Sequence, residues 1–339
     1  MSIPETMRAL VQLHDGYSGT QEGPAIDTVA PYLELREIPV PQPAAGQVLI
    51  KVDLAAVNPS DLHFIKGEYG QPRIKDCPAG FEGVGTVVAG DSPFMGQRVS
   101  FFATHSGTWA DYAMTEAQGL VPCRPDLAAA DAAGQIVNPL TAMAMFDIVR
   151  ESGADSFILN AAGSQLGKLL IGLGRDYGIA PIAVVRRAEQ ADLLREHGAA
   201  EVLITSDEDM MANAAPILRE RKPRILLDAV GDQATADLFF AMPNRARWVN
   251  YGKLSTTPPQ LTQMGQLIFQ QKVIEGFWLT RWMKDTAPQK LGAVIAEVQE
   301  RFVSGKWQTD VAAIVPLADV MQSLPAATKV VDGKVFIKP

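Results

Sequence analysis

The feature that most constrains the fold is a regular alternation of short apolar runs and helix-like segments, which begins at about residue 130. Each apolar run has the length of a buried strand, and apolar residues at helical spacing follow the first one at 166, 169, 170 and 173. The expected strands are 157–160, 182–185, 202–204, 225–228 and 248–251. Because such alternation builds a parallel sheet covered by helices on both faces, it predicts a doubly wound α/β domain of the Rossmann type.

The preceding part of the chain has a different texture. Residues 1–127 are rich in proline, glycine and short β-like runs, and the run 334–338 resembles them. We therefore expect one β-rich domain made of residues 1–127 and 306–339, and a dinucleotide-binding domain over residues 128–305. A helix over 291–303 would carry the chain back to the first domain.

Charge and cysteine content exclude several classes of protein. The 30 basic and 38 acidic residues give a net charge of −8, which disfavours a nucleic-acid surface. With only Cys77 and Cys123, neither a disulfide framework nor a four-cysteine metal site is possible. The first ten residues lack the pattern of a secretory signal, and no apolar stretch is long enough to cross a bilayer. These features predict a cytoplasmic protein with a small-molecule ligand and no membrane partner.

The segment Ala-Ala-Gly-Ser-Gln-Leu-Gly at 161–167 lies where a dinucleotide-binding domain places its phosphate loop. Small residues let backbone N–H groups approach a pyrophosphate, and the helix N-terminus favours the anion. Gly163, Ser164, Gln165 and Leu166 are therefore candidate cofactor-binding residues. The alternative is a tight strand–helix turn without a ligand.

The end of the second expected strand carries Arg186 and Arg187 where an NAD-binding domain usually has an acidic residue. A guanidinium pairs with a 2′-phosphate, which an acid would repel. This pattern favours NADPH over NADH; the alternative is a solvated basic strand end.

No metal site is expected. A trio of His63, Cys77 and Glu82 is conceivable, but no two histidines lie at a short ligand spacing and Cys77 has no partner in the usual motifs. Cys123 is expected to be an inert buried thiol. Hydride transfer without a metal must polarise the substrate in another way, for example through side-chain or backbone hydrogen bonds.

Several segments resemble the medium-chain dehydrogenase/reductase superfamily, which combines a β-rich GroES-like catalytic domain with a Rossmann domain. Phe81 stands where its zinc enzymes have a histidine, so the chain resembles a zinc-independent member. The resemblance narrows to 2-enoyl thioester reductases of the mitochondrial trans-2-enoyl-CoA reductase type. It rests on segments spread along the chain, at 57–61, 67–70, 107–109, 137–142, 184–186, 251–252 and 276–282.

This resemblance implies NADPH-dependent reduction of a trans-2-enoyl thioester carried by coenzyme A or acyl carrier protein. It makes Tyr69 the proton donor. Asn58, together with Asp61, would orient Tyr69 or the thioester, although Asn-Pro-Ser-Asp is equally a good helix start. The positions that the resemblance places at the cofactor are Asn138, Thr141, Ser164, Arg186, Tyr251, Gly252, Phe277, Trp278, Leu279 and Lys334.

The chain also departs from that family. Gln165 replaces a glycine of the phosphate loop, Ala188 replaces a second basic residue, and Phe81 lies beside the expected substrate pocket. Trp278 and Trp282 would line an acyl pocket, or else belong to the core or a subunit interface. A strand over 272–280 at the edge of the sheet predicts a homodimer.

Two other functions remain open from the sequence. One is an NADPH:quinone oxidoreductase, which would share the fold and the cofactor. The other is a non-catalytic NADPH-binding protein, which the degraded glycine pattern would suit.

Overall fold

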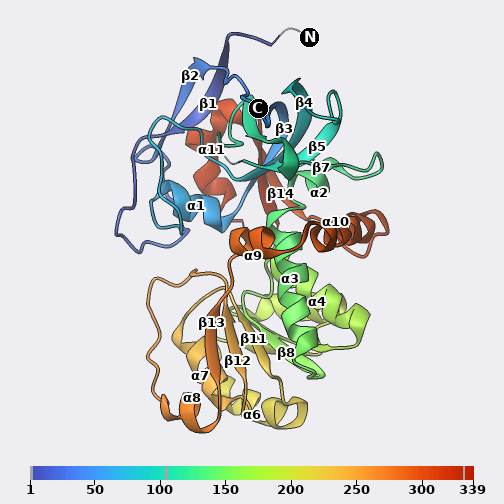
Figure 1. Ribbon diagram of the computed structural model, residues 1–339. Coiled ribbons are helices and arrows are strands. Elements are labelled where there is room, and N and C mark those ends of the chain that lie inside the picture. Colours follow the sequence, from blue (N-terminus) through green and yellow to red (C-terminus); the bar gives the residue numbers. More distant parts are fainter. Residues whose placement is uncertain (1–2, 104–105, 331–332) are drawn as a thin grey trace. The chain divides into compact units, whose positions relative to one another are not determined.

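The computed structural model describes residues 3–103, 106–330 and 333–339, and it divides into two compact units (Figure 1). Unit 1 contains residues 1–138 and 295–339, and unit 2 contains residues 139–294. The division thus falls about ten residues away from the expected boundaries, at 138 rather than 127 and at 294 rather than 305.

Unit 1 is built on a sheet in which strands from both ends of the sequence meet. The path through its main sheet is β14-β15-β3-β4-β5-β7, with β6 paired to β3, and β1 and β2 form a separate hairpin. Its strands are β1 (Thr6–Gln12), β2 (Leu33–Pro39), β3 (Gln47–Val57), β4 (Glu82–Gly90), β5 (Arg98–Phe102), β6 (Tyr112–Glu116), β7 (Val121–Pro122), β14 (Val311–Pro316) and β15 (Lys334–Lys338). The expected return of the chain to the first domain is therefore confirmed, because β15 pairs with β3 in antiparallel register.

Short helices accompany this sheet. They are α1 (Pro59–Ile65), α2 (Ala129–Ala133), α11 (Val320–Ala327) and the 3-10 turns η1 (Ala117–Gly119) and η3 (Leu317–Asp319). Two longer helices, α3 (Val137–Glu151) and α10 (Pro288–Val303), run from one unit's residues into the other's.

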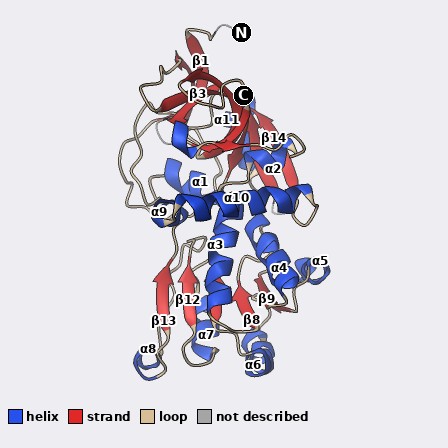
Figure 2. Cartoon of the chain, turned by 45° about the vertical axis from the view of Figure 1, so that its right-hand side comes forward, coloured by secondary structure: helices blue, strands red, loops and turns tan. Residues whose placement is uncertain are grey.

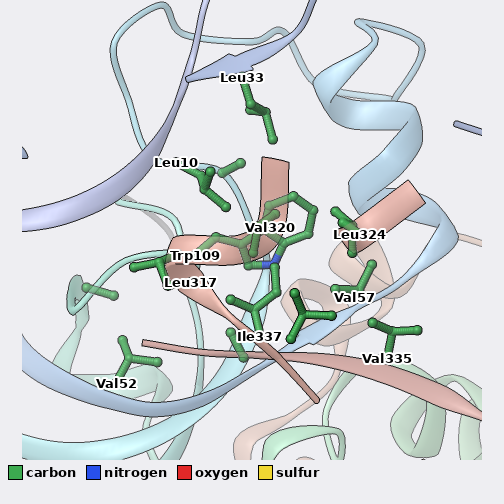
Figure 3. Close-up of a cluster of buried hydrophobic side chains, with 14 of the residues drawn as sticks. Leu10, Leu33, Val52, Val57, Trp109, Leu317, Val320, Leu324, Val335 and Ile337 are labelled. Atoms are coloured by element: carbon green, nitrogen blue, oxygen red, sulfur yellow. The ribbon is translucent and has the colours of Figure 1, made fainter. Parts of the chain in front are cut away.

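The core of unit 1 surrounds Trp109, whose side chain is completely buried (Figure 3). Leu10, Val57, Leu324 and Ile337 come from distant parts of the sequence and belong to the same cluster. The indole Nε1 donates to the carbonyl of Ala56 at 3.1 Å, so the polar edge of the ring is satisfied. Truncating such a side chain to alanine typically costs about 3–5 kcal/mol of stability.

Specific contacts explain why the boundary segments belong to unit 1. The Ser100 hydroxyl donates to the Ala132 carbonyl at 2.6 Å, which holds α2 against β5. In α10, the Gln299 side chain accepts from the Arg124 backbone N–H at 3.0 Å and donates to the Pro122 carbonyl at 3.0 Å. Individual polar side chains therefore hold these segments to unit 1. The expected boundaries rest on the alternation of strand-like and helix-like segments, which does not report such contacts.

Unit 2 is the expected doubly wound domain (Figure 2). Its six parallel strands have the order β10-β9-β8-β11-β12-β13. From β8 the chain adds strands toward one edge of the sheet, and from β11 it adds them toward the other, so the strand order reverses between β8 and β11. The strands are β8 (Ser156–Leu159), β9 (Ala180–Val185), β10 (Glu201–Ile204), β11 (Ile225–Asp228), β12 (Arg247–Asn250) and β13 (Val273–Gly276). The helices are α4 (Gln165–Tyr177), α5 (Ala191–His197), α6 (Met210–Arg221), α7 (Gln233–Ala241), α8 (Gly265–Phe269), α9 (Leu279–Asp285) and the 3-10 turn η2 (Ala188–Gln190).

The strand expected over 272–280 is shorter in the structure. β13 ends at Gly276, and Trp278 is the N-cap of α9. None of the helices in the described ranges has both the length and the apolarity needed to cross a bilayer.

Candidate active site

The loop after β8 lies at the reversal point of the unit 2 sheet, where doubly wound domains bind their ligands. Ala161 has a φ of 47°, in the left-handed region that non-glycine residues rarely adopt. Ser164 is the N-cap of α4, and its hydroxyl accepts from the Gly167 N–H at 3.1 Å. The sequence-predicted loop residues 163–166 therefore surround the N-terminus of a 13-residue helix, which favours a bound anion.

Gly167 allows this helix to start close to the loop. A Cβ at this position would lie 2.4 Å from the Ala162 carbonyl oxygen, so only glycine fits without a shift. Gly167 thus keeps the role of the glycine that closes the dinucleotide fingerprint, although Gln165 occupies the preceding glycine position. Gln165 is the first residue of α4.

Arg186 and Arg187 follow β9 directly, and both are exposed. Within the described ranges neither guanidinium has an ion-pair partner, and the next acidic residue, Glu189, is also exposed. Two unpaired guanidinium groups one strand away from the phosphate loop suit a ligand with an additional phosphate.

Gln190 was missed by the sequence reasoning. Its side-chain amide lies against the phosphate loop, because a Cβ on Gly163 would be 2.5 Å from Gln190 Nε2. The residue follows the arginine pair by three positions, but no spacing rule relates it to the loop.

Tyr251 and Gly252 follow β12 at the same carboxyl edge of the sheet. The Tyr251 hydroxyl is buried and has no hydrogen-bond partner among the described residues. Burial raises the pKa of this phenol well above its usual value, and the nearby Asp228 charge raises it further. A buried donor without an acceptor fits a bound polar ligand that supplies one.

The segment after β13 contains four more of the predicted site residues. Phe277 extends the strand, because its N–H donates to the Asn250 carbonyl at 2.8 Å. Trp278 is 41% exposed, Leu279 begins α9, and Trp282 lies one turn into that helix. Trp278 is thus exposed and Trp282 partly buried, and neither belongs to the buried cluster of unit 2 around Phe239.

Thr141, predicted to lie at the cofactor, is a buried residue near the start of α3, in its second turn, within unit 2. Taken together, the residues of unit 2 fit a dinucleotide with a third phosphate. The phosphate loop with its glycine-limited helix start, the unpaired arginines and the orphaned Tyr251 hydroxyl each provide a separate observation for that fit.

Asn58 and Lys334, two predicted site residues of unit 1, are hydrogen-bonded to each other. Lys334 Nζ donates to Asn58 Oδ1 at 2.5 Å and lies 3.3 Å from Glu82 Oε1, while Asn58 Nδ2 donates to Glu82 Oε1 at 3.0 Å. Glu82 is fully buried, and its second oxygen accepts from the N–H groups of Ile136 and Val137 at the start of α3. The next residue is Asn138, so Glu82 fixes the backbone that presents this predicted cofactor residue.

This arrangement changes the interpretation of the Asn-Pro-Ser-Asp segment. Asn58 is the N-cap of α1, and the Asp61 carboxylate accepts from its backbone N–H at 2.7 Å. The segment therefore begins a helix, one of its two predicted roles, and the Asn58 side chain is held by Glu82 and Lys334. That Asn58 and Asp61 orient Tyr69 or a thioester stays a prediction. Desolvation raises the pKa of the fully buried Asp61 to about 7, and the Glu82 charge contributes to the rise.

Tyr69 lies in an aromatic group of unit 1. Its ring centroid is 5.2 Å from that of Phe81 and 6.4 Å from that of Phe64, and Phe81 stacks on Phe102 at 5.6 Å. Phe81 is buried, whereas Tyr69 is partly exposed. The phenol is therefore held by apolar side chains, and its partial exposure leaves it accessible to a substrate.

Within the described ranges, no group of three or more histidine, cysteine or acidic side chains is arranged to hold a metal ion. Burial raises the pKa of both Cys77 and Cys123 above the usual value, which lowers the thiolate fraction of each.

Comparisons with known proteins agree with this architecture. Residues 44–126 match the family described as Alcohol dehydrogenase GroES-like domain, and residues 166–297 match the family described as Zinc-binding dehydrogenase. The mitochondrial enoyl-[acyl-carrier-protein] reductase of Bos taurus is 29% identical over 336 residues, which cover 96% of this chain and 87% of the relative. Its counterpart in Dictyostelium discoideum is 30% identical over 249 residues and 70% of each chain.

Solved structures extend the comparison. A Mesorhizobium loti protein, provisionally assigned as an NADPH:quinone reductase, is 48% identical over 100% of both chains, with a TM-score of 0.96. The mitochondrial 2-enoyl thioester reductase heterodimer of Candida tropicalis shares the fold at 22% identity, with a TM-score of 0.79 over 98% of this chain and 100% of that chain.

A β-rich unit combined with a doubly wound unit that carries a phosphate loop defines an oxidoreductase of the dinucleotide-dependent type. The chain belongs to the medium-chain dehydrogenase/reductase superfamily, among the relatives of the mitochondrial enoyl thioester reductases.

Proposed function

We propose that this protein uses NADPH to reduce an activated C=C bond, and that its substrate is a trans-2-enoyl thioester. The observation that carries the substrate class is the aromatic group of unit 1, in which Tyr69 lies 5.2 Å from Phe81. By its resemblance to the zinc alcohol dehydrogenases, the chain has Phe81 where those enzymes have a histidine. This unit therefore offers a phenol hydroxyl and apolar rings to an acyl chain, where a zinc enzyme offers a metal to an alcohol.

Bound NADPH supplies a hydride, which the β-carbon of the enoyl group accepts. Charge then develops on the thioester oxygen, and hydrogen-bond donors of the protein stabilise it. Tyr69 donates a proton to the α-carbon, since a neutral phenol carries an O–H group. The phosphate loop and the two arginines after β9 bind the dinucleotide, and the preference for NADPH rests on Arg186 and Arg187.

A quinone reductase is the second candidate, and one observation favours it. The Mesorhizobium loti protein that is 48% identical carries that provisional assignment, and its identity to this chain exceeds that of the enoyl reductases reported above. A planar quinone would also stack on aromatic rings such as Phe81.

The deciding experiment measures NADPH oxidation by the purified protein with crotonyl-CoA, hexenoyl-CoA and a benzoquinone, each repeated with NADH. Faster turnover of the enoyl thioesters with NADPH supports the proposal. Faster turnover of the quinone assigns the second function, and NADPH binding without turnover of any acceptor assigns a non-catalytic role.

The carrier of the acyl group depends on basic surface residues. Four basic residues, Arg73, Lys75, Lys284 and Lys290, are candidates for docking an acidic carrier protein. Arg73 is buried and donates to backbone carbonyls, and Lys290 pairs with Asp147 at 3.1 Å, whereas Lys75 and Lys284 remain exposed. Because only two of these four are exposed without an ion pair in the described part of the chain, we propose coenzyme A rather than acyl carrier protein as the carrier.

We also propose that the protein is a homodimer that pairs through unit 2. β13 is the edge strand of the sheet, and exposed apolar side chains gather on and just before it. They are Met264, Ile268, Phe269, Val273 and Ile274, with Ile268 at 72% and Phe269 at 84% exposure. An exposed apolar edge of this kind is typical of a subunit interface.

A further inference from the structure

Asp228 is a buried carboxylate that the proposed reaction does not use. It ends β11 at the reversal point of the sheet and has no exposed surface. Within the described ranges no lysine, arginine or histidine forms an ion pair with it. Since an isolated buried charge is unfavourable, its hydrogen bonds must compensate for lost hydration.

Five N–H groups converge on this carboxylate. Oδ1 accepts from the Asn160 side chain, from the Val230 N–H at 2.8 Å and from the Gly231 N–H at 2.9 Å, and the Thr235 hydroxyl lies within 3.4 Å of it. Oδ2 accepts from Trp248 Nε1 at 2.7 Å and from Asn250 Nδ2 at 2.9 Å. Such charge-assisted bonds are among the stronger ones in proteins.

The donors come from the residue after β8, from the loop after β11 and from β12, so the carboxylate joins three neighbouring parts of the sheet edge. Asn160 directly precedes the left-handed Ala161, at which the phosphate loop begins. Its Oδ1 also accepts from the Ala229 N–H at 2.7 Å, which ties the phosphate loop to the loop after β11.

Asn250 directly precedes Tyr251 and Gly252. A Cβ on Gly252 would lie 2.7 Å from the Ala229 carbonyl oxygen, so the loops after β11 and β12 are in close contact. The arginines after β9 have no bond to this network.

We infer that Asp228 is a positioning residue for the dinucleotide, which fixes the phosphate loop and the loop of Tyr251 and Gly252 relative to each other through one carboxylate. The inference rests on the proposed function, since it assumes that these loops bind NADPH. It predicts that Asp228 controls the part of the site formed by these two loops and leaves the 2′-phosphate end, formed by the arginines after β9, independent.

The substitution Asp228→Asn tests this role with little change in volume. An amide has one acceptor oxygen, so its NH₂ group must face donors of either the Oδ1 set or the Oδ2 set. If the oxygen stays with the three donors on the loops, the Trp248 N–H loses its acceptor, and β12 is released from β11.

The binding of two probes, NADPH and adenosine 2′-monophosphate, is measured by calorimetry with the wild type and the variant. We expect Asp228→Asn to weaken NADPH binding by about tenfold or more, the scale of one lost charged hydrogen bond. Binding of adenosine 2′-monophosphate should change by less than about twofold, because that ligand needs only the arginine end. Asp232→Asn is the matched control, since Asp232 caps α7 in the same loop and asparagine caps equally well.

The outcomes distinguish a failure of the positioning role of Asp228 from a failure of the proposed NADPH-dependent function. If the wild type binds NADPH and Asp228→Asn binds it equally well, or loses both probes in parallel, the positioning role is refuted. If the wild type itself does not bind NADPH, the proposed function fails instead.

Should Asp228→Asn not fold, Asn250→Ala removes a single donor and is expected to weaken NADPH binding alone by about threefold, a part of the energy of one such bond. Hydrogen exchange provides a second readout, with faster exchange in residues 229–231 and 251–255 but not after β9. Unchanged exchange and unchanged NADPH binding in Asn250→Ala would also refute the role.

Discussion

Replacing the buried Asp61 of unit 1 by asparagine should remove a pH dependence of stability that can be calculated in advance. Burial raises the pKa of this carboxyl from 3.8 to about 7, with Glu82 raising it and Lys334 lowering it through their charges. The folded protein therefore holds the proton more tightly than the unfolded chain does. The resulting stability is fully present below about pH 3.8 and disappears as the pH rises through about 7.

The size of the effect follows from the two pKa values. At 1.36 kcal/mol per pKa unit, the rise from 3.8 to about 7 corresponds to about 4 kcal/mol, of which about 3 kcal/mol is lost between about pH 5 and pH 8. In Asp61→Asn the amide oxygen still accepts from the Asn58 N–H, and the side chain no longer titrates. Relative to the wild type, the variant should therefore gain about 3 kcal/mol of stability over this interval.

Urea unfolding of both proteins, followed by circular dichroism at about pH 5 and pH 8, measures this difference. The comparison cancels the titration of the other groups, provided that they behave alike in the two proteins. Equal pH dependence in the two proteins would show that Asp61 is ionised throughout, and the argument from burial would then be wrong. If the variant instead lost more stability than the wild type between pH 5 and pH 8, the effect would have the opposite sign, and the argument from burial would also be wrong.

Three other predictions concern the proposed function. Tyr69→Phe should lower kcat with crotonyl-CoA by about 100-fold or more, the usual contribution of a general acid, while NADPH binding is retained. Arg186→Ala combined with Arg187→Ala should raise the KM for NADPH by more than about tenfold, because charged hydrogen bonds to the 2′-phosphate are lost, and should leave the KM for NADH unchanged. Phe269→Asp, which places a charge on the exposed apolar edge of unit 2, should convert the dimer into a monomer in analytical ultracentrifugation.

Each of these variants has a matched control elsewhere on the chain. Tyr17→Phe alters an exposed loop tyrosine, Arg195→Ala removes an exposed arginine that pairs with Asp192, and Ile74→Asp charges an exposed apolar residue of unit 1. The controls should behave like the wild type. A role is contradicted if its control and its variant give the same result, or if Phe269→Asp sediments as the wild type does.

The sequence predicts the central strands of unit 2 well because they are short apolar runs that the fold buries completely, as in Ile225–Asp228. It also locates the phosphate loop, since a strand, small residues and a helix follow one another directly. The end of β13 is less predictable: Trp278 suits a strand by its composition, but in the structure it caps a helix.

The polar networks could not be predicted, because their members are far apart in sequence. Asn160 and Asp228 are separated by 68 positions, and Lys334 and Asn58 by 276. Periodicity reports which face of an element is buried, whereas these contacts depend on the order of the strands. Lys334 could be assigned to the cofactor only by resemblance, and the structure adds that its ammonium holds Asn58 and Glu82.

The place of β15 between β14 and β3 has a consequence for synthesis in the cell. Unit 2 is continuous in sequence, so it can fold as soon as its own residues have left the ribosome. Unit 1 cannot complete its sheet until residues 334–338 follow, roughly 10–40 s after residue 138 at ordinary translation rates. During that interval one edge of β3 lacks its strand partner, and the buried Glu82 lacks the ammonium of Lys334. In nascent chains of this protein, the residues of unit 1 that are synthesised before unit 2 should therefore need chaperones for the longest time.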